Sequence, residues 1–368
     1  MTTADTPPRL AALRQGLAPK EVEALLVSGP ENRRYLSGFT AGDPDAGVLL
    51  ITAKAAWLLT DFRYQLWAGQ EALGFEVLVY KESLGATLSE VLRQHRVNRL
   101  GFEGSSLTYG QYQRLNQAVA EAGLKVDWVP VDGLTEDLRE TKTPAELAAI
   151  RRALNLSEAV LRQVAGELAP GLTERQVAWE IEKRLREAGA EGLAFPPIVA
   201  AGLNSAMPHH QPGDYPLKAG EPIIIDMGGR LNGYCADLTR TFILGPPDDQ
   251  FRKIYRLVRQ AQMRAEKGIK AGMDSLTADG LAREVIAQAG YGDAFGHSLG
   301  HGVGLAVHEA PSLSPYKERN TVLKAGSVVT VEPGIYLAGW GGVRLENLAL
   351  LHPDHAEVLN HFLEFYEW

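Results

Sequence analysis

The chain has 368 residues, of which 45% are hydrophobic and 22% are charged, the proportions of an ordinary globular protein. Its 37 basic and 45 acidic residues give a formal net charge of −8, which argues against a general binder of nucleic acid or of anionic membranes. A single cysteine excludes an intrachain disulfide and a cysteine-based zinc cluster. We find neither a secretory signal pattern nor an apolar run of the ~20 residues that span a membrane, and therefore expect a soluble cytoplasmic protein of roughly two domains.

Residues 1–140 alternate between helical patterns and short strand-like runs. The first helical pattern carries Leu10, Leu13 and Leu17 at helical spacing and leads into an apolar run. The strand-like runs are 24–27, 47–52, 55–61, 75–80, 99–104 and 126–131, and the later helical patterns are 64–72, 88–96 and 111–123. The alternation predicts an α/β domain over residues 1–140, with an open sheet and flanking helices.

A second domain is predicted over residues 141–368, and it begins with two helices. Each opens with a capping box, in which a threonine is followed three residues later by glutamate or glutamine. The boxes are Thr143–Glu146 and Thr173–Gln176, and the helices are predicted over 144–168 and 177–190. After residue 195 the chain turns to strands rich in Gly, Pro, His and carboxylates, interrupted by one helical stretch over 251–290. This half of the chain therefore has a mixed α+β pattern.

Two aspartates in this domain lie in strand contexts where a solvated surface position is not expected. Asp226 closes an apolar run, and burial of such a carboxylate is costly unless a cation or several donors compensate it. Asp237 follows 11 residues later, again among strand formers. The turn formers Asn232 and Gly233 lie between the two aspartates. They predict a hairpin whose pairing brings the two carboxylates together.

Three further residues share this kind of context. His301 lies in a segment punctuated by glycine and histidine, Glu332 lies between a valine-rich run and a Pro-Gly turn, and Glu346 lies in an alternating strand. Two aspartates, two glutamates and a histidine form a hard, oxygen-rich ligand set that suits Mn²⁺, Co²⁺ or Zn²⁺. Four crowded carboxylates repel one another, so two divalent ions are expected to neutralise them, with an activated water between the ions.

The order and surroundings of these residues resemble the metal-binding signature of the pita-bread metallopeptidases, the family of aminopeptidase P, prolidase and methionine aminopeptidase. In residues 145–368 the resemblance rests on the motifs IDMG, ADLTRT, GHGVGLAVHE, VEPGIY and GGVRLEN. In residues 8–135 it rests on ENRRYLSGFT and LLTDFRY, which are similar to the creatinase-type N-terminal domain. The resemblance implies an N-terminal creatinase-like α/β domain followed by a pita-bread catalytic domain.

The resemblance also implies a role for each member of the ligand set. Asp226 would bind one metal ion alone, while Asp237 and Glu346 would bridge two. His301 and Glu332 would complete the second site, and Glu332 would also act as the general base that takes a proton from the attacking water. Mn²⁺ is the metal expected first, with Co²⁺ and Zn²⁺ as alternatives.

Four residues outside the ligand set match family positions with further roles. His209 and His308 match histidines that contact the substrate, the first near the oxyanion and leaving group and the second at the scissile carbonyl. His297 lies four residues before the ligand histidine and is assigned a supporting role. Arg344 lies two residues before a ligand glutamate and resembles an arginine that orients a ligand carboxylate.

Other residues of these segments have structural explanations that compete with functional ones. We interpret His210 as a loop residue with polar neighbours and Cys235 as a small buried residue. Tyr336 and Trp340 fit a substrate pocket and core packing equally well. Asn347 stands where many family members carry aspartate, which is expected to alter the electrostatics around the preceding glutamate without removing a ligand.

The leading hypothesis is a dinuclear-metal exopeptidase that hydrolyses the Xaa-Pro bond, as either an Xaa-Pro dipeptidase or an aminopeptidase P. The alternatives are another metalloaminopeptidase of the same fold and a non-catalytic binding protein. The domain predicted over residues 1–140 disfavours methionine aminopeptidase, and the complete ligand set disfavours creatine amidinohydrolase and a non-catalytic protein. Because similar proteins form dimers, a proline-containing peptide and a second copy of the chain are the expected partners.

Overall fold

The computed structural model describes residues 6–362 and 365–366 of the chain. The chain divides into two compact units, Met1–Arg139 and Glu140–Trp368. The boundary predicted after residue 140 lies directly beside this division. Among the described residues, no helix is long and apolar enough to cross a membrane.

The first unit is built around a six-stranded sheet with the strand order β4-β3-β2-β1-β5-β6. The strands are β1 (Ala24–Val27), β2 (Val48–Thr52), β3 (Ala56–Thr60), β4 (Glu76–Val79), β5 (Arg99–Phe102) and β6 (Asp127–Pro130). The helical segments are α1 (Thr6–Leu17), η1 (Ala18–Lys20), α2 (Pro30–Ser37), η2 (Phe62–Tyr64), α3 (Gln65–Glu71), α4 (Leu84–Gln94), α5 (Tyr109–Glu121) and α6 (Leu134–Glu140). The strand β1 pairs antiparallel with β2 and parallel with β5. Each predicted strand run and helical pattern corresponds to one of these elements, so the open sheet with flanking helices is confirmed.

The helix α2 is not predicted by the sequence pattern, because its buried face carries polar side chains. Asn32, Arg33 and Ser37 are buried on this helix. The Arg33 guanidinium donates hydrogen bonds of 2.6 Å to the carbonyl oxygens of Gly47 and Ala41. A helix that buries such groups lacks the apolar periodicity by which amphipathic helices are recognised.

The second unit has its α-helices where the capping signals place their starts. They are α7 (Pro144–Gly166), α8 (Glu174–Glu187), α9 (Asp249–Gly268) and α10 (Ser275–Gln288). Both predicted capping boxes, at the starts of α7 and α8, are confirmed in both directions of hydrogen bonding. The single helical stretch predicted over 251–290 is wrong, since it contains two helices. Helix α9 ends at Gly268, after which Ile269 is extended, and the Asp274 carboxylate then caps α10 by accepting from the Thr277 N–H.

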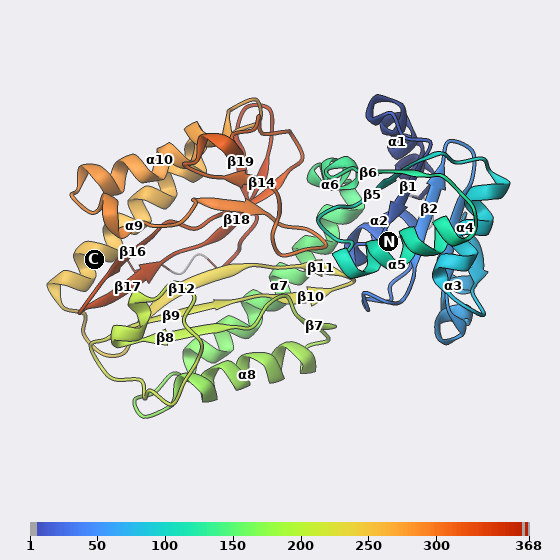
Figure 1. Cartoon of the computed structure of the whole chain (residues 1–368). Helices are drawn as coiled ribbons and strands as arrows, with labels where there is room; N and C mark the ends of the chain where they lie inside the picture. Colours follow the sequence, from blue (N-terminus) through green and yellow to red (C-terminus); the bar gives the residue numbers. More distant parts are fainter. Residues whose placement is uncertain (1–5, 363–364, 367–368) are drawn as a thin grey trace. The chain divides into compact units, whose positions relative to one another are not determined.

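The strands of the second unit form several small sheets. The elements are β7 (Gly192–Leu193), β8 (Ile198–Ala201), η3 (Gly202–Ala206), β9 (Pro222–Met227), β10 (Gly229–Leu231), β11 (Tyr234–Cys235), β12 (Leu238–Ile243), η4 (Gly292–Ala294), β13 (Gly300–Gly302), β14 (Glu309–Leu313), η5 (Lys317–Arg319), β15 (Val328–Val331), β16 (Gly334–Leu337), β17 (Gly341–Arg344), β18 (Asn347–Leu351) and β19 (Ala356–Val358). The sheet orders are β12-β9-β8, β14-β13-β15-β18-β19, β16-β17 and β11-β10-β7. The strands lie between α7 and α8 on one side and α9 and α10 on the other (Figure 1).

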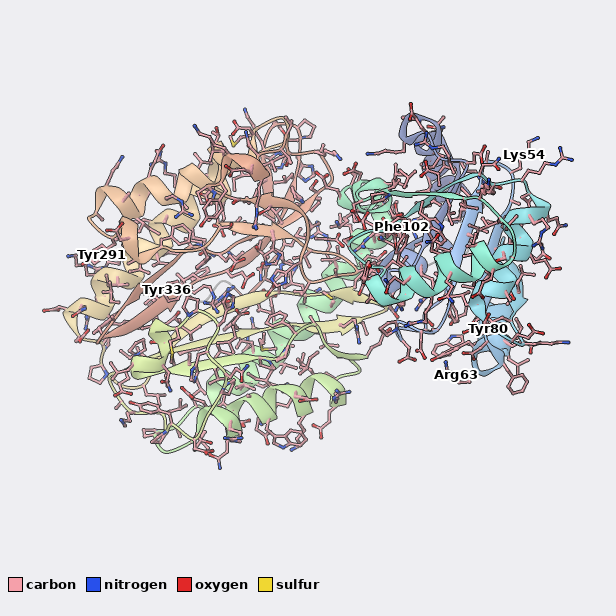
Figure 2. The ribbon with its side chains drawn as sticks, in the orientation of Figure 1. Lys54, Arg63, Tyr80, Phe102, Tyr291 and Tyr336 are labelled. Atoms are coloured by element: carbon pink, nitrogen blue, oxygen red, sulfur yellow. The ribbon has the colours of Figure 1, made fainter. Side chains whose placement is uncertain are left out.

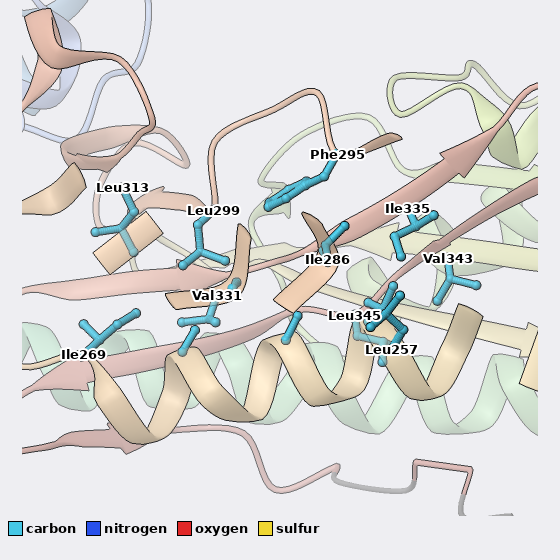
Figure 3. Packing of buried hydrophobic residues seen from close by; sticks show 14 of the residues in the cluster. Leu257, Ile269, Ile286, Phe295, Leu299, Leu313, Val331, Ile335, Val343 and Leu345 are labelled. Atoms are coloured by element: carbon cyan, nitrogen blue, oxygen red, sulfur yellow. The ribbon is translucent and has the colours of Figure 1, made fainter. Parts of the chain in front are cut away.

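A hydrophobic core packs α9 and α10 against the strands that lead to the predicted site. Ile286 of α10 belongs to the same buried cluster as Val331 of β15 and Val343 of β17 (Figure 3). Full burial of each such aliphatic side chain contributes about 1.5–3 kcal/mol to stability. Glu332 directly follows Val331, and Arg344 directly follows Val343. Two residues of the predicted site are therefore attached to rigid, well-packed strand ends.

The predicted hairpin between the two aspartates is confirmed. Asn232 and Gly233 have φ values of 51° and 81°, as a tight hairpin turn between β10 and β11 requires. The longer strands on either side, β9 and β12, also pair antiparallel and place Asp226 opposite Thr239. Since Asp237 lies two residues before Thr239, the two aspartates lie at the same end of the strand pair.

Candidate metal centre

The predicted ligands all lie in the second unit, within strands or directly beside their ends. They are Asp226 in β9, Asp237 directly before β12, His301 in β13, Glu332 directly after β15, and Glu346 between β17 and β18. Gly300 and Gly302 flank His301, and a Cβ atom on either glycine would overlap the backbone of a neighbouring strand. The glycines are thus required for the close strand packing that holds the histidine in place.

His301 connects the acidic residues of the site. Its Nε2 atom lies 3.3 Å from Oε1 of Glu332 and 3.6 Å from Oδ2 of Asp237. Asp237, His301 and Glu346 each offer one ligand atom, and these atoms lie within 4.8 Å of one another. The structure therefore brings the carboxylates of Asp237, Glu332 and Glu346 together around one imidazole.

Two carboxylate oxygens of the site are buried without a hydrogen-bond partner among the residues that the structure describes. They are Oδ1 of Asp226 and Oε1 of Glu346. A buried acceptor left unsatisfied costs about 1–3 kcal/mol, and more when it is charged. Such a pair of oxygens, next to further carboxylates and an imidazole, is the donor set that a hard divalent cation takes. The residues present therefore fit the predicted metal ions.

The electrostatics of the buried carboxyls reflect this crowding. Burial raises the pKa of Asp237 well above its usual value, and the neighbouring negative charge of Glu346 adds to the effect. Burial likewise raises the pKa of Glu346 well above its usual value, with further contributions from Glu332 and Asp226. Burial raises the pKa of Asp226 too, although the Arg344 guanidinium opposes that shift. Without a cation, the site therefore favours protonated carboxyls.

The pKa values of Glu332 and His301 shift in favour of the charged forms, because the two side chains form an ion pair. Burial alone would raise the pKa of Glu332, but the hydrogen bond and the charge of His301 outweigh it and lower the pKa to about 2. Burial alone would lower the pKa of His301, but its hydrogen bond to Glu332 raises the pKa. Thr330 also donates to Glu332 Oε1 at 2.9 Å. Glu332 is therefore ionised at neutral pH and can accept a proton.

Arg344 holds Asp226 and a neighbouring tyrosine in place. Its Nη2 atom donates to Asp226 Oδ2 at 2.7 Å, in a pair that is almost fully buried. Its Nη1 atom donates to the Tyr336 hydroxyl at 2.8 Å and to the Pro208 carbonyl at 3.3 Å. One oxygen of Asp226 is thus satisfied by arginine, and the other is left for a cation.

His297 reaches the site through Tyr336, which is labelled in Figure 2. The Nδ1 atom of His297 lies 2.8 Å from the Ser298 carbonyl oxygen, which can only accept, so Nδ1 carries the proton. Burial lowers the pKa of His297 and favours the neutral ring, so Nε2 is an acceptor at 3.0 Å from the Tyr336 hydroxyl. Tyr336 therefore links His297 to Arg344, and of its two sequence interpretations the structure favours a place at the site.

Thr239 is not among the residues predicted for the site, although it contacts two of them. Its hydroxyl donates to Glu346 Oε2 at 2.7 Å and accepts from Arg344 Nε at 3.3 Å. The signal available in the sequence is strand alternation, because Thr239 lies two residues after Asp237 and therefore on the same face of the chain.

Comparisons with known proteins identify the family of the chain. A family model described as metallopeptidase family M24 matches residues 148–353, and one described as the creatinase/prolidase N-terminal domain matches residues 9–141. The chain belongs to metallopeptidase family M24. The predicted family, and a fold that joins a creatinase-type N-terminal domain to an M24 catalytic domain, are thereby confirmed.

The M24 chain is similar along almost its whole length to several relatives. It is 34% identical to an Xaa-Pro dipeptidase of Pyrococcus furiosus, over 95% of this chain and 97% of that protein. A solved Xaa-Pro dipeptidase from Bacillus anthracis matches with a TM-score of 0.91 and 37% identity, over 97% of this chain and 98% of the other. A solved X-Pro aminopeptidase from Thermotoga maritima MSB8 matches with a TM-score of 0.83 and 35% identity, over 92% and 95% of the two chains.

Two further histidines of this M24 peptidase lie on exposed loops beside the ligand set. The ring of His308 lies 4.2 Å from the ring of His301, measured between centroids. The pKa of His308 is lowered by burial and by the charge of His301, and to a smaller extent by the charge of His209. Both His209 and His308 are exposed to solvent.

The competing structural explanations can now be compared with the contacts. His210 Nε2 lies 2.8 Å from Glu174 Oε2, so His210 has the polar neighbour that the sequence analysis expects. Cys235 is buried, with its sulfur 3.7 Å from the Leu305 carbonyl oxygen. Trp340 packs against the hydrophobic core beside α9 and α10. Of the two interpretations of Trp340, packing is therefore the better supported.

Asn347 uses both ends of its amide in a buried network behind the metal centre. Its Oδ1 atom accepts from Arg240 Nη2 at 2.9 Å, and its Nδ2 atom donates to Glu266 Oε1 at 2.6 Å. Arg240 also donates to the backbone carbonyl of Glu346. An asparagine fits here because it offers an acceptor to the arginine and a donor to the glutamate, whereas aspartate offers only acceptors.

We expect Asn347→Asp to lower the free energy of unfolding by about 1–3 kcal/mol at pH 7.5, because it places two carboxylates in contact inside the protein. Chemical denaturation of the variant checks this value. The double variant Asn347→Asp with Glu266→Gln restores one donor and one acceptor at the contact and is expected to recover most of the loss. If Asn347→Asp alone unfolds at the same denaturant concentration as the parent protein, this explanation of Asn347 is wrong.

Proposed function

We propose that this M24 peptidase is a dinuclear-metal exopeptidase that hydrolyses the bond between an N-terminal residue and proline. The observation that carries the proposal is a cluster of buried acidic groups. Asp226, Asp237 and Glu346 lie with Glu332 and His301, and one oxygen each of Asp226 and Glu346 has no hydrogen-bond partner among the described residues. The substrate class is supported by the relatives, which are named Xaa-Pro dipeptidase and X-Pro aminopeptidase.

The residues that would hold the two ions are Asp226, Asp237, His301, Glu332 and Glu346. Mn²⁺ is the metal proposed first, with Co²⁺ and Zn²⁺ as alternatives, because imidazole and carboxylate ligands suit all three. When bound, such ions polarise a carbonyl group and make water a stronger nucleophile at neutral pH.

The chain's own groups supply the proton chemistry. Glu332 is the proposed general base, because its carboxylate is ionised at neutral pH and faces the ligand histidine. Its basicity depends on the charge of His301, since a neutral imidazole no longer lowers the pKa of the carboxylate as an imidazolium does. With neutral His301, Glu332 becomes a stronger proton acceptor and can take the proton of the attacking water.

His209 and His308 are proposed to contact the substrate. Both are exposed, and His308 adjoins His301. An imidazole N–H in that place can donate to the scissile carbonyl oxygen as negative charge develops on it, or protonate the leaving nitrogen. Arg344 acts on the site through Asp226, whose carboxyl group it orients and whose burial it partly compensates, and His297 acts through Tyr336.

The direct test is hydrolysis of Xaa-Pro peptides of two to five residues by the purified protein, after metal removal and after addition of Mn²⁺. We expect turnover that requires the metal and stops when proline in the second position is replaced by alanine. Binding of no divalent ion at micromolar concentration, or metal-dependent cleavage without preference for proline, would contradict the proposal.

The same assay separates the two candidate activities. An Xaa-Pro dipeptidase hydrolyses only the dipeptide, whereas an aminopeptidase P also hydrolyses tripeptides and longer substrates. The relatives support both possibilities, since one solved structure is a dipeptidase and another an aminopeptidase. Cleavage of the dipeptide alone would exclude the aminopeptidase.

We further propose a homodimer, supported by an exposed apolar surface in the first unit. Phe62 and Leu66 are 82% and 81% exposed, and Trp67 beside them is 42% exposed. They adjoin Arg63, which is labelled in Figure 2. Contiguous exposed apolar side chains of this kind often mark an interface. Sedimentation velocity should give twice the mass of the chain, and a monomer at micromolar concentration would contradict this proposal.

The cellular location proposed is the cytoplasm. The sequence has a single cysteine, which is buried, so the fold uses no disulfide of the kind that stabilises many secreted proteins. Fractionation of cells that express the natural protein tests the location.

A further inference from the structure

The two histidines proposed to contact substrate lie on irregular backbone. His209 lies in the long loop between η3 and β9, and His308 lies directly before β14. Both side chains are exposed. A catalytic group has to be held within about 0.5 Å of its productive position, and a loop does not provide this by its own backbone pairing. Contacts with other residues must therefore hold these two loops in place.

The first loop is tied to a fully buried carboxylate at the start of α8. Glu174 Oε2 lies 2.8 Å from His210 Nε2 and accepts from the Gly213 N–H at 3.0 Å. Glu174 Oε1 accepts from the Ala201 N–H at 2.8 Å and from Asn204 Nδ2 at 3.0 Å. The other three partners donate N–H groups to the carboxylate. His210 becomes the fourth donor when its Nε2 atom carries the proton. The Glu174 carboxylate thus binds residues that precede the loop as well as residues within it.

Two other contacts restrain the same loop from outside. The Pro208 carbonyl accepts from Arg344 Nη1, which connects the loop to the residue that holds Asp226. The Arg175 N–H donates to the Gly213 carbonyl at 3.0 Å. The segment between Pro208 and Gly213 is therefore fixed at both ends, and His210 is the side chain that ties down its middle.

The second loop has an equivalent contact on the residue after its histidine. Glu309 Oε1 lies 2.6 Å from Lys142 Nζ, and the two side chains are only 6% and 1% exposed. Lys142 Nζ also donates to the Glu140 carbonyl at 3.1 Å. Gly304 lies against the Glu309 carboxylate so closely that a Cβ atom there would overlap it. The bend before β14 is thus packed around a buried ion pair.

We propose that His210 and Glu309 are positioning residues, each of which orients the exposed histidine that precedes it in the chain. Glu174 anchors the first and Lys142 anchors the second. The proposal rests on the proposed function in that it takes His209 and His308 as the groups that contact substrate. His209 lies in a turn and His308 in a bend, and each shares a planar peptide bond with the residue after it, so a contact that fixes His210 or Glu309 also restricts the backbone of the histidine before it.

His210→Ala is the sharpest variant, because Glu174 keeps three N–H donors and remains compensated. We expect kcat to fall about tenfold, since small misplacements of a reacting group cost between tenfold and a hundredfold, with little change in bound metal. In the His209→Ala background, adding His210→Ala should lower kcat by less than twofold further. His210→Gln can donate from its amide to the same carboxylate oxygen and should recover most of the activity.

The matched control is Arg175→Ala, which removes an exposed ion pair to Asp214 on the same loop. Exposed pairs of this kind contribute little, so its kcat should equal that of the parent protein. An unchanged kcat in His210→Ala, or a loss of equal size with and without His209, would overturn the proposal for the first loop. Loss of the metal from His210→Ala would also overturn it, because the residue would then support the metal centre instead.

The second loop is tested with Lys142→Met combined with Glu309→Gln, which removes both charges and so leaves no isolated buried ion. We expect a fall in kcat of about tenfold, which should disappear in the His308→Ala background. A fall that persists there in full would show that the pair acts on the site by another route and would overturn the proposal for this loop.

Hydrogen exchange separates a failure of this proposal from a failure of the proposed function. In His210→Ala the amides of residues 206–213 should exchange faster than in the parent protein, while in Arg175→Ala they should not. This comparison does not depend on the substrate. If the parent protein fails to cleave Xaa-Pro peptides, the proposed function is wrong. The exchange rates still decide whether His210 anchors the loop. Unchanged exchange in His210→Ala would overturn the anchor itself.

Discussion

Glu332→Gln is expected to lower kcat for an Xaa-Pro dipeptide by about 10³-fold, within the range that a general base contributes. The variant keeps the size of the side chain and an oxygen that can accept from Thr330, so the fold should persist. It removes the group that takes the proton from water. Steady-state kinetics at saturating Mn²⁺ measures the loss, and the metal content of the variant is measured in parallel because Glu332 is also a proposed ligand.

Glu318→Gln provides the control, since Glu318 is an exposed glutamate in η5 of the same unit and is not one of the proposed ligands. It should leave kcat unchanged. If Glu332→Gln binds both ions and keeps more than a tenth of the parent activity, Glu332 is not the general base. If it loses an ion, activity at raised Mn²⁺ concentration decides whether the loss comes from the metal or from the proton transfer.

The residues proposed as metal ligands stand out in the sequence because their signals are local. Asp226 and Glu332 each close an apolar run, and Asp237 and Glu346 lie among strand formers, where a carboxylate stands out. Asn232 and Gly233 gave the hairpin for the same reason, because a left-handed turn depends on two adjacent residues. The family resemblance then supplied the roles, which no local pattern contains.

The contacts between distant residues could not be predicted. The link from His297 through Tyr336 to Arg344 joins the segment before β13 to the paired strands β16 and β17, and its first hydrogen bond spans 39 residues of sequence. The ties of Glu174 to His210 and of Lys142 to Glu309 span 36 and 167 residues of sequence. Sequence patterns report neighbours along the chain, whereas these networks are set by the tertiary fold.

The error in the helical stretch over 251–290 has a different cause. Apolar residues continue at helical spacing on both sides of the break, so periodicity alone joins α9 to α10. The sequence signals that separate them are the capping aspartate at 274 and the glycines at 268 and 272, which are poor helix formers. Asp274 is a helix-capping residue, as Thr143 and Thr173 are, and it marks the start of the second helix.

Glu346→Gln is expected to stabilise the metal-free protein and to destabilise the metal-bound one. In EDTA at pH 7.5, the parent protein has to keep Glu346 protonated against its usual pKa or bury its charge beside Glu332 and Asp226, and the neutral amide avoids both costs, so the free energy of unfolding should rise by about 1–3 kcal/mol. With Mn²⁺ present, the parent protein gains stability by binding, whereas the variant lacks one proposed bridging ligand and should gain far less. Thermal unfolding in both conditions should therefore reverse the order of the two proteins.

The sign of the pH dependence follows from the raised pKa values of the three buried carboxyls. A carboxyl whose pKa is higher in the folded state than in the unfolded chain favours folding only while it is protonated, so its contribution to stability declines as pH rises above the unfolded value. The metal-free parent should lose stability between about pH 5 and pH 8, and Glu346→Gln should lose less.

Metal binding has to displace the same protons, and it must also take one from His301, whose pKa is raised by Glu332. The increase in melting temperature caused by a fixed Mn²⁺ concentration should therefore grow from pH 5.5 to pH 8 in the parent protein. Asp293→Asn, a change at an exposed aspartate of the same unit, should behave like the parent in every condition. If Glu346→Gln is less stable than the parent in EDTA as well as in Mn²⁺, the glutamate stabilises the fold by itself, and the repulsion that requires a cation is not present.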